Sequence, residues 1–162
     1  MKFWLDTEFY EDGYSIQLIS IGVVSENGRE YYAESPASMF LAGRTPWLAA
    51  NVRPHLRGNI VNPFDMRKEL IEFFGEKPEI WGYYADYDWV VLCQVFGRMI
   101  DLPRGWPMYC RDVKQLCDDW GHPKLPEKLK VQHDALCDAR WTKLAWEYLD
   151  SLRCQRSSRD GA

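Results

Sequence analysis

Phe3-Trp4-Leu5-Asp6-Thr7-Glu8 places two acids directly after a run of three apolar residues near the start of the chain. Side chains alternate between the two faces of an extended strand, so residues two apart project from the same face. Asp6 and Glu8 are therefore expected to lie side by side. Two carboxylates at that spacing repel each other, and a hard divalent cation such as Mg²⁺ or Mn²⁺ relieves the repulsion. Alone, Asp-x-Glu is more often a strand whose polar face meets water, so the rest of the chain must decide.

The composition is that of an ordinary folded domain. The 162 residues can form one domain with a sizeable core, and 46% hydrophobic with 27% charged residues is typical of such a domain. The net charge of −4 argues against a broad basic surface for long duplexes. It does not argue against an enzyme that grips one chain end through metal ions. The many aromatic residues can be core, which is the default, or platforms for nucleobases.

Cysteine usage and hydropathy indicate the cellular setting. The five cysteines are odd in number and form no Cys-x-x-Cys pair, and no signal peptide is recognisable. Both features favour reduced thiols and a cytoplasmic location. No Cys/His spacing fits a zinc site. No apolar run approaches the roughly 20 residues that span a membrane, so no membrane partner is expected.

The pattern of strands and helices predicts an α/β fold. Strands are expected at 2–6, 14–24 and 29–34, with an Asn-Gly hairpin turn before the third, which together indicate an antiparallel meander. Later periodicities indicate short strands at 79–82 and 108–110 and helices at 64–74, 86–97, 111–119 and 133–150. This order predicts a mixed five-stranded sheet flanked by helices and matches the ribonuclease H-like fold, although order alone fits several others.

Two further segments bear on domain organisation. Residues 35–62 are rich in Pro and Gly, and we expect a long irregular segment there with one helical turn near 47–52. The polar residues 151–162 are expected to form a flexible tail. Residues 1–150 then form a single domain.

A second acidic point follows the strand at 79–82, in Tyr84-Ala85-Asp86-Tyr87-Asp88. Open α/β sheets place their sites where such a strand meets the next helix. Asp86 has an ordinary explanation as a helix cap. Asp88 lies inside the first turn and is the better candidate, although an acid there can also serve only the helix dipole.

The third point is His133-Asp134-Ala135-Leu136-Cys137-Asp138. Five residues of helix rotate by about 500°, so His133 and Asp138 do not align on one helix. They can meet if His133 lies on the preceding loop, Asp134 caps the helix and Asp138 lies within it. An unperturbed imidazole titrates near neutrality, which suits a proton acceptor. Alone, a His and an Asp at a helix start are more often structural.

Together the candidates form one set: Asp6, Glu8, Asp88, His133 and Asp138. Four carboxylates can hold two Mg²⁺ or Mn²⁺ ions about 3.5–4 Å apart, the usual geometry for phosphodiester hydrolysis. One ion is expected to activate the attacking water and the other to stabilise the leaving oxygen. His133 is expected to accept the proton of the water as general base.

These motifs closely resemble the DEDDh family of 3'→5' exonucleases in the ribonuclease T group. That family has Asp-x-Glu, then an aromatic-Asp after a strand, then His-x-x-x-x-Asp. The counterparts here are Asp6 with Glu8, Asp88 after Tyr87, and His133 with Asp138. The register of Tyr87-Asp88 favours Asp88 over Asp86.

Within that group the chain looks most like the RNase AS type, the polyadenylate-specific exoribonucleases. Residues 6–9, 11–13, 19–24, 28–32, 92–94 and 133–136 carry the likeness, which spans about 3–149. It implies hydrolysis of single-stranded RNA 3' ends with release of AMP or another nucleoside monophosphate, Mg²⁺ dependence and a homodimer. Phe9 is a candidate platform for the terminal base, with core packing equally consistent. Arg111 is a candidate phosphate contact, with a surface salt bridge at least as consistent.

Two alternatives stay open at this point. The first is a DNA 3'→5' exonuclease of the same fold, which differs in whether the 2'-hydroxyl is recognised. The second is a non-catalytic RNA-binding domain. The complete set of acids argues against the second alternative, since a binding domain has no need to hold repelling carboxylates together.

Overall fold

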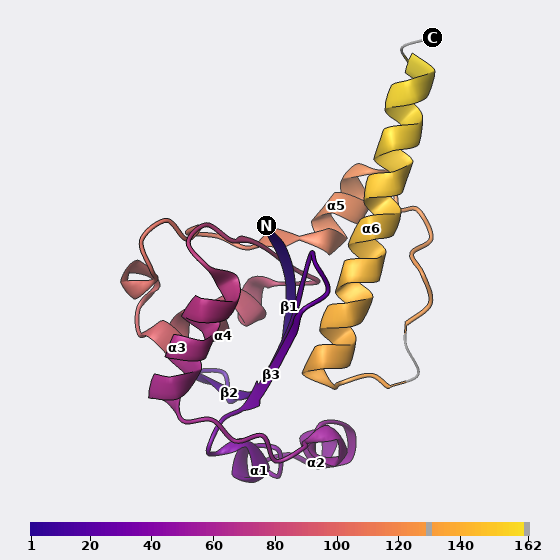
Figure 1. Cartoon of the computed structure of the whole chain (residues 1–162). Helices are drawn as coiled ribbons and strands as arrows, with labels where there is room; N and C mark the ends of the chain where they lie inside the picture. Colours follow the sequence, from indigo (N-terminus) through magenta and orange to yellow (C-terminus); the bar gives the residue numbers. More distant parts are fainter. Residues whose placement is uncertain (129–130, 161–162) are drawn as a thin grey trace.

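The computed structural model describes residues 1–128 and 131–160, with side chains up to Arg153 (Figure 1). The strands are β1 (Lys2–Glu11), β2 (Ile16–Ser25), β3 (Glu30–Glu34), β4 (Glu79–Gly82) and β5 (Arg111–Asp112). The α-helices are α1 (Ser38–Leu41), α2 (Pro46–Asn51), α3 (Pro63–Phe74), α4 (Asp86–Phe96), α5 (Val113–Asp119) and α6 (Ala135–Asp160). Two short 3₁₀ helices are η1 (Arg53–His55) and η2 (Met99–Asp101).

The strands form one mixed sheet of five strands in the order β3-β2-β1-β4-β5, which confirms the predicted fold class. β1, β2 and β3 make the expected antiparallel meander, whereas β4 pairs with β1, and β5 with β4, in parallel. Because β1 is the central strand, Asp6 and Glu8 lie in the middle of the sheet. The pairing of β1 with β2 shifts register between Glu8 and Phe9, and such a bulge bends a strand locally.

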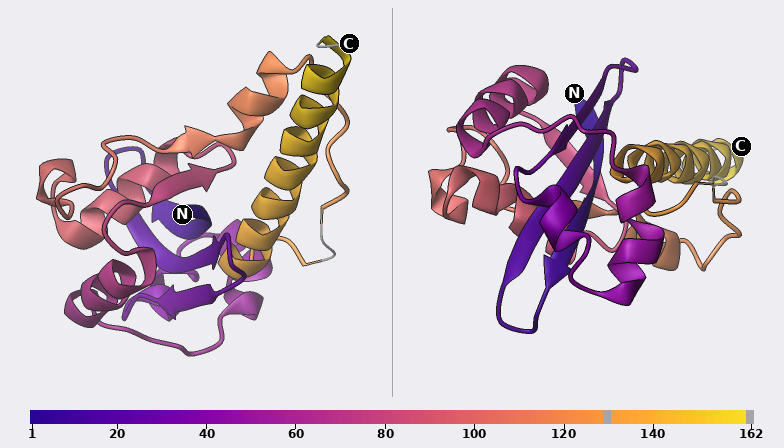
Figure 2. Two further views of the ribbon diagram at one scale, coloured as in Figure 1. Left: turned by 45° about the horizontal axis from the view of Figure 1, so that its top comes forward. Right: turned by 90° about the horizontal axis from the view of Figure 1, so that it is seen from below.

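Helices cover both faces of the sheet, as Figures 1 and 2 show. On one face, Phe3 and Leu5 of β1 pack with residues of α3 and α4. On the other, Trp4 packs with α5 and α6 around Trp141 and Leu149. The alternation along β1 thus sends successive side chains into two different cores. α6 crosses the second face and extends past the edge of the sheet (Figure 1).

One residue lets α6 lie directly on the sheet. A Cβ on Gly22 of β2 would lie 2.4 Å from the backbone of Ala135 and Leu136, in the first turn of α6. Gly22 is also the β2 residue paired with Asp6. The close approach therefore brings the first turn of α6 next to the acids of β1.

Three expectations from the sequence need correction. Segment 35–62 contains α1 and η1, which the sequence does not predict, whereas α2 confirms the helical turn predicted near 47–52; Thr45 caps α2 through the Leu48 N–H and Pro46 occupies its first turn. The last strand is Arg111–Asp112 instead of 108–110. Residues 151–160 continue α6, because they contain no Gly or Pro to end a helix. The flexibility of the tail remains a prediction, and residues 161–162 lie outside the described chain.

Candidate active site

A pocket of about 340 Å³ opens along residues 6–9 of the central strand β1, beside the residues that directly follow β4 and the first turn of α6. Residues from both faces of the sheet and from the loop before α6 line it. They are Asp6, Thr7, Glu8, Phe9, Trp47, Tyr83, Tyr84, Asp88, Lys128, His133, Asp138, Trp141 and Thr142. All five residues of the catalytic set predicted from the sequence thus share one cavity.

The middle residue of Asp6-Thr7-Glu8 holds the second acidic point in place. Both the backbone N–H and the hydroxyl of Thr7 donate to Oδ1 of Asp88, at 2.8 and 2.6 Å. Asp88 is 6% exposed and lies in the first turn of α4. Because Thr7 faces α4 while its neighbours face α6, this part of β1 joins acids from the two layers of the molecule.

The third acidic point is built at the start of α6. Asp134 caps the helix, with its Oδ1 accepting from the N–H groups of Leu136 and Cys137 at 3.1 and 3.0 Å. This confirms the predicted cap. His133 precedes it in the left-handed region, with φ of 61°, and its backbone N–H donates to Oδ2 of Asp138 at 2.7 Å. His133 and Asp138 are five residues apart, and their side chains meet because the backbone turns at His133.

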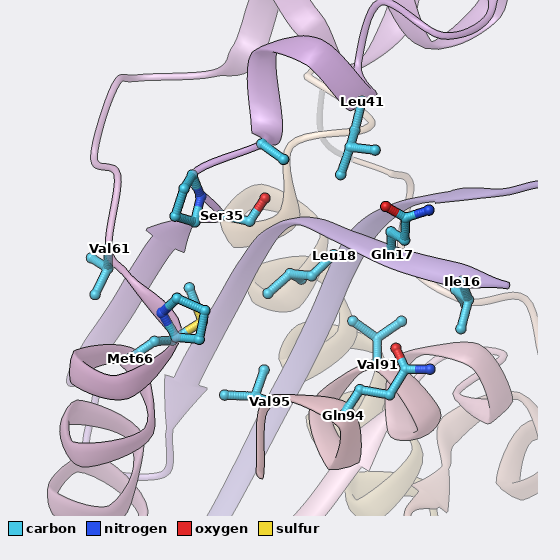
Figure 3. A pocket seen from close by; sticks show the side chains of 13 residues that line it. Ile16, Gln17, Leu18, Ser35, Leu41, Val61, Met66, Val91, Gln94 and Val95 are labelled. Atoms are coloured by element: carbon cyan, nitrogen blue, oxygen red, sulfur yellow. The ribbon is translucent and has the colours of Figure 1, made fainter. Parts of the chain in front are cut away.

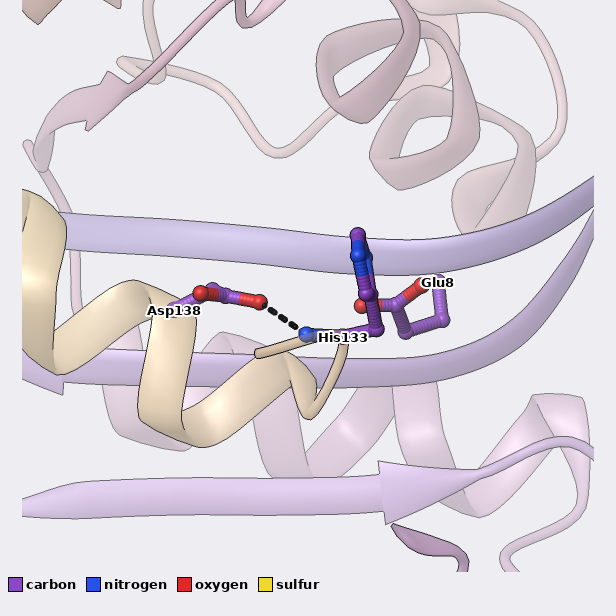
Figure 4. A group of neighbouring side chains, drawn as sticks. All are labelled: Glu8, His133 and Asp138. Atoms are coloured by element: carbon purple, nitrogen blue, oxygen red, sulfur yellow. Dashed lines mark hydrogen bonds between the residues drawn. The ribbon is translucent and has the colours of Figure 1, made fainter. Parts of the chain in front are cut away.

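Glu8, His133 and Asp138 could together hold one metal ion (Figure 4). Each offers a ligand atom, and these atoms lie within 4.8 Å of one another. A carboxylate–imidazole set of this size fits a divalent cation. One imidazole nitrogen cannot bind an ion and accept a proton at the same time. His133 as a metal ligand and His133 as a general base are therefore exclusive alternatives.

The electrostatics of the acids also favour a cation. Burial, followed by the Asp138 and Asp88 carboxylates, raises the pKa of Glu8 to about 8. Burial and the neighbouring acids likewise hold the pKa of Asp6 well above its ordinary value. Burial raises the pKa of Asp138, against the opposing bond from His133. A bound cation would favour the ionised form of each acid.

The pKa of Asp88 is raised less than the pKa of Glu8. Burial of Asp88 raises its pKa to about 6, while the two hydrogen bonds from Thr7 oppose the change. The Lys128 ammonium lowers the pKa of Asp6, Glu8 and Asp138, although burial and acid repulsion outweigh it. Its ammonium lies 5.1 Å from the Trp141 ring centroid at the pocket wall.

Aromatic side chains surround the acids. The Phe9 ring lies 5.5 Å from that of Tyr87, tilted by 36°. Trp47 of α2 meets the His133 ring edge-on at 4.8 Å, with 52% of its surface exposed. Sequence reasoning missed Trp47, Lys128 and Tyr84. The sequence predicts the helical turn around Trp47, but no local pattern indicates the contact of Trp47 with His133.

Asp86 and Arg111, the two other charged residues considered from the sequence, lie outside the acidic pocket. Asp86 is exposed, and Ala85, whose N–H donates to Asp112 Oδ2 at 2.8 Å, occupies the cap position of α4. Arg111 is in β5, where its Nε lies 3.8 Å from Glu79 Oε1 and its guanidinium covers Trp81. It does not line the acidic pocket. It also does not open α5, because Asp112 caps that helix.

A second cavity, of about 430 Å³, is larger but chemically different (Figure 3). It lies between β2, the segment after β3, and helices α3 and α4. Its lining is mainly apolar, with Leu18, Val61, Met66, Val91 and Val95, and none of the described residues that line it is an acid, a base or a thiol. Size therefore does not identify the reactive site of this protein, whereas the clustered acids do.

Comparison with known proteins assigns the chain to a class and then to a family. Residues 1–149 match the domain described as "3'-5' exoribonuclease Rv2179c-like domain". This match places the chain in the class of nucleases. It belongs to the Rv2179c-like exoribonuclease family. Two relatives from Mycobacterium tuberculosis are 41% identical over 149 residues, covering 86% of this chain and 88% of each relative. They are 3'-5' exoribonuclease MT2234.1 (strain CDC 1551 / Oshkosh) and 3'-5' exoribonuclease Rv2179c (strain ATCC 25618 / H37Rv).

Solved structures support the fold. E. coli Exonuclease I, in complex with a dT13 oligonucleotide, superposes with a TM-score of 0.60 at 16% identity over 98% of this chain and 42% of that chain. A chain from the structure of the yeast NOT1 MIF4G domain co-crystallized with CAF1 gives a TM-score of 0.54 at 11% identity, over 94% of this chain and 80% of that chain. In the described part of the chain, no helix combines the length and apolar character needed to cross a membrane.

Proposed function

We propose that this protein is a 3'→5' exoribonuclease that hydrolyses the 3' end of single-stranded RNA to nucleoside 5'-monophosphates. The observation that carries the proposal is the meeting of Asp6, Glu8, Asp88, His133 and Asp138 in one pocket. Membership of the Rv2179c-like family supports it, since the curated relatives are named 3'-5' exoribonucleases. The DEDDh pattern of the five residues agrees with this assignment.

The carboxylates fit a divalent metal centre. Their donor set is all oxygen, and burial, together with the neighbouring carboxylates, raises the pKa of each acid. We propose that Asp6, Glu8, Asp88 and Asp138 hold two Mg²⁺ ions, for which Mn²⁺ can substitute. Bound ions would supply charge stabilisation for the phosphodiester transition state and lower the pKa of the attacking water.

The protein residues then have distinct parts. His133 accepts a proton from the attacking water as general base, while its N–H bond to Asp138 orients it. Thr7 orients Asp88. Phe9, whose ring contacts that of Tyr87, offers a stacking surface for the last base. Arg111 has no part in this proposal, because it lies outside the pocket.

Finer properties extend the same proposal. A preference for adenylate with AMP as product, a homodimer and a cytoplasmic location are proposed from the RNase AS resemblance. The aromatic walls of the pocket support recognition of a base, since stacking tolerates any base and hydrogen bonds to its edge would select one.

The test is product analysis on 3'-labelled homopolymer RNAs and their deoxyribose counterparts. With Mg²⁺ we expect labelled nucleoside 5'-monophosphate from RNA at once, fastest from polyadenylate, and no product in EDTA. Asp6→Asn and Asp138→Asn should be inactive. Full activity of either variant would exclude the two-metal site, and faster release from the deoxyribose chain would instead indicate a DNA exonuclease.

A base role for His133 has its own test. A histidine must be neutral to accept a proton, so kcat at saturating Mg²⁺ should fall as the pH drops through the imidazole range. His133→Gln should lower kcat by roughly 10²–10⁴-fold and remove that limb of the profile. A flat profile in the natural protein would contradict the role.

A further inference from the structure

A second acidic residue, Glu34 at the end of β3, is buried away from the pocket and organises the loop beyond α2. It is 0% exposed, and its Oε1 accepts from the Arg57 N–H at 2.5 Å, the Gly58 N–H at 3.0 Å and the Tyr32 hydroxyl at 2.9 Å. These hydrogen bonds offset the cost of burying the carboxylate. The backbone at Arg57 is therefore held in one position by the core of the protein.

The side chain of Arg57 reaches from that anchored backbone to the start of α6. One guanidinium nitrogen, Nη2, lies 2.7 Å from Oδ1 and 2.5 Å from Oδ2 of Asp134. The guanidinium also lies over the Tyr32 ring at 4.3 Å. Asp134 is 6% exposed and precedes the helix by one residue. Arg57 thus bonds the residue that directly follows His133.

His133 needs such support. Its φ of 61° is unusual for a residue with a side chain and costs free energy, so it persists only where the surroundings impose it. The same segment that carries Arg57 also carries Trp47, whose ring contacts the imidazole. The 35–62 segment therefore contacts both His133 itself and its neighbour in the chain.

We propose that Arg57 is a positioning residue for His133: through Asp134, and with its backbone held by Glu34, it fixes the imidazole over the acidic pocket. This inference rests on the proposed role of His133. Arg57 acts through another residue and need not contact RNA. Partners of this kind, one contact removed from a metal site, typically change activity by roughly 10–100-fold when they are lost.

The chain offers a matched control in Arg140 of α6. Arg140 bonds Glu30 of β3 through Nε and Nη2 at 2.7 and 2.6 Å, so it also ties α6 to the β3 edge by an Arg–carboxylate pair. It lies beyond the acids, toward the middle of the helix. If tethering α6 were all that matters, losing either arginine should have the same effect.

The experiment compares Arg57→Met, Arg57→Lys and Arg140→Met as full-length proteins, well below their unfolding temperatures. For Arg57→Met we expect kcat on polyadenylate to fall roughly 10–100-fold, with KM and the half-saturating Mg²⁺ concentration little changed. Arg140→Met should keep its kcat. Arg57→Lys should recover part of the loss, because a single nitrogen makes the contact and an ammonium can occupy that place.

A double variant separates positioning from general stability. If Arg57 acts through His133, Arg57→Met should cost little in the His133→Gln background, since coupled residues are not additive. An equal loss in both backgrounds, an equal loss in Arg140→Met, or a raised KM with unchanged kcat would overturn the proposal. A fully active Arg57→Met beside an inactive His133→Gln overturns only this inference. An active His133→Gln overturns the proposed base.

Discussion

At the residue scale, the site depends on the alternation of side chains along three positions of one strand. Asp6 and Glu8 face α6 and the pocket, and Thr7 between them faces α4 and bonds Asp88. A single position of β1 thus links the acids of the two layers. The hydroxyl of Thr7 supplies one of two hydrogen bonds that favour the ionised form of Asp88.

Thr7→Val should therefore weaken catalysis without unfolding the protein. Valine has a similar shape, so packing is kept, but Asp88 loses the hydroxyl donor and retains only the backbone N–H. We expect a loss of roughly 10–100-fold in activity or in apparent Mg²⁺ affinity, the range for a partner of a metal ligand. Mg²⁺ titrations of exonuclease rate measure both. Thr7→Ser keeps the hydroxyl and should stay close to the natural rate; equal loss in both variants would contradict a role for the hydroxyl.

How far the sequence predicts these residues depends on how local the information is. The pairing of Asp6 with Glu8 follows from strand alternation, and the cap at Asp134 follows from the chemistry of helix starts. Trp47 and Arg57 belong to a Pro- and Gly-rich segment with no periodicity, and their partners lie about 80 residues further along the chain. Contacts of that kind depend on tertiary packing, and no local pattern encodes them.

At the element scale, the crossing of β2 and α6 determines where Asp138 and His133 lie. Gly22 allows the backbone of Ala135 to touch the sheet beside Asp6. The strands and helices themselves follow from periodicity, and most predicted ranges agree with the structure. The strand order and this close crossing do not follow, because they depend on which elements pack together.

Gly22→Ala tests the crossing. The new Cβ would lie 2.4 Å from three backbone atoms of α6, so the helix start must move. Overpacking of this kind costs about 1–3 kcal/mol, and we expect a lower midpoint of thermal unfolding together with weaker activity. Differential scanning calorimetry and the exonuclease assay measure the two effects.

Gly43→Ala is the matched control for this substitution. Its Cβ would lie 3.4 Å from Phe40 O and 3.6 Å from Met39 O, which are ordinary van der Waals distances, so stability and activity should remain close to those of the natural protein. Unchanged stability in Gly22→Ala would show that α6 does not depend on this contact.

At the scale of the whole molecule, the acidic pocket lowers the stability of the metal-free protein. Glu8 has a pKa of about 8 when folded, against an ordinary 4.5. Below pH 4.5 it is protonated in both states. As the pH rises from there to 8, the unfolded chain releases this proton while the folded protein keeps it, so the free energy of unfolding falls. Asp88, raised to about 6, adds to the lower part of the same window.

In EDTA, the contribution of Glu8 should therefore appear as a loss of stability between about pH 5 and pH 8. Each pKa unit is worth about 1.4 kcal/mol, so denaturant unfolding at several pH values should resolve it. Other carboxylates titrate in the acid range, and the natural protein is therefore compared with Glu8→Gln. The difference between the two proteins should vary with pH in this window; a constant difference would contradict the raised pKa of Glu8.

Metal should reverse this balance, and Asp6→Asn separates stability from function. Mg²⁺ needs ionised ligands, so its binding should strengthen as the pH rises and should stabilise the folded state by mass action. In EDTA near pH 7.5, we expect Asp6→Asn to unfold at a higher temperature than the natural protein, since it removes a buried acid repelled by Glu8, Asp88 and Asp138. With Mg²⁺ the order should invert, because the variant binds the ions poorly, and its exonuclease activity should be lost. Thermal unfolding at matched pH, with EDTA and with Mg²⁺, measures both orders. If Mg²⁺ raised the unfolding temperature of Asp6→Asn as much as that of the natural protein, Asp6 would not bind metal and the acids of this pocket would have another function.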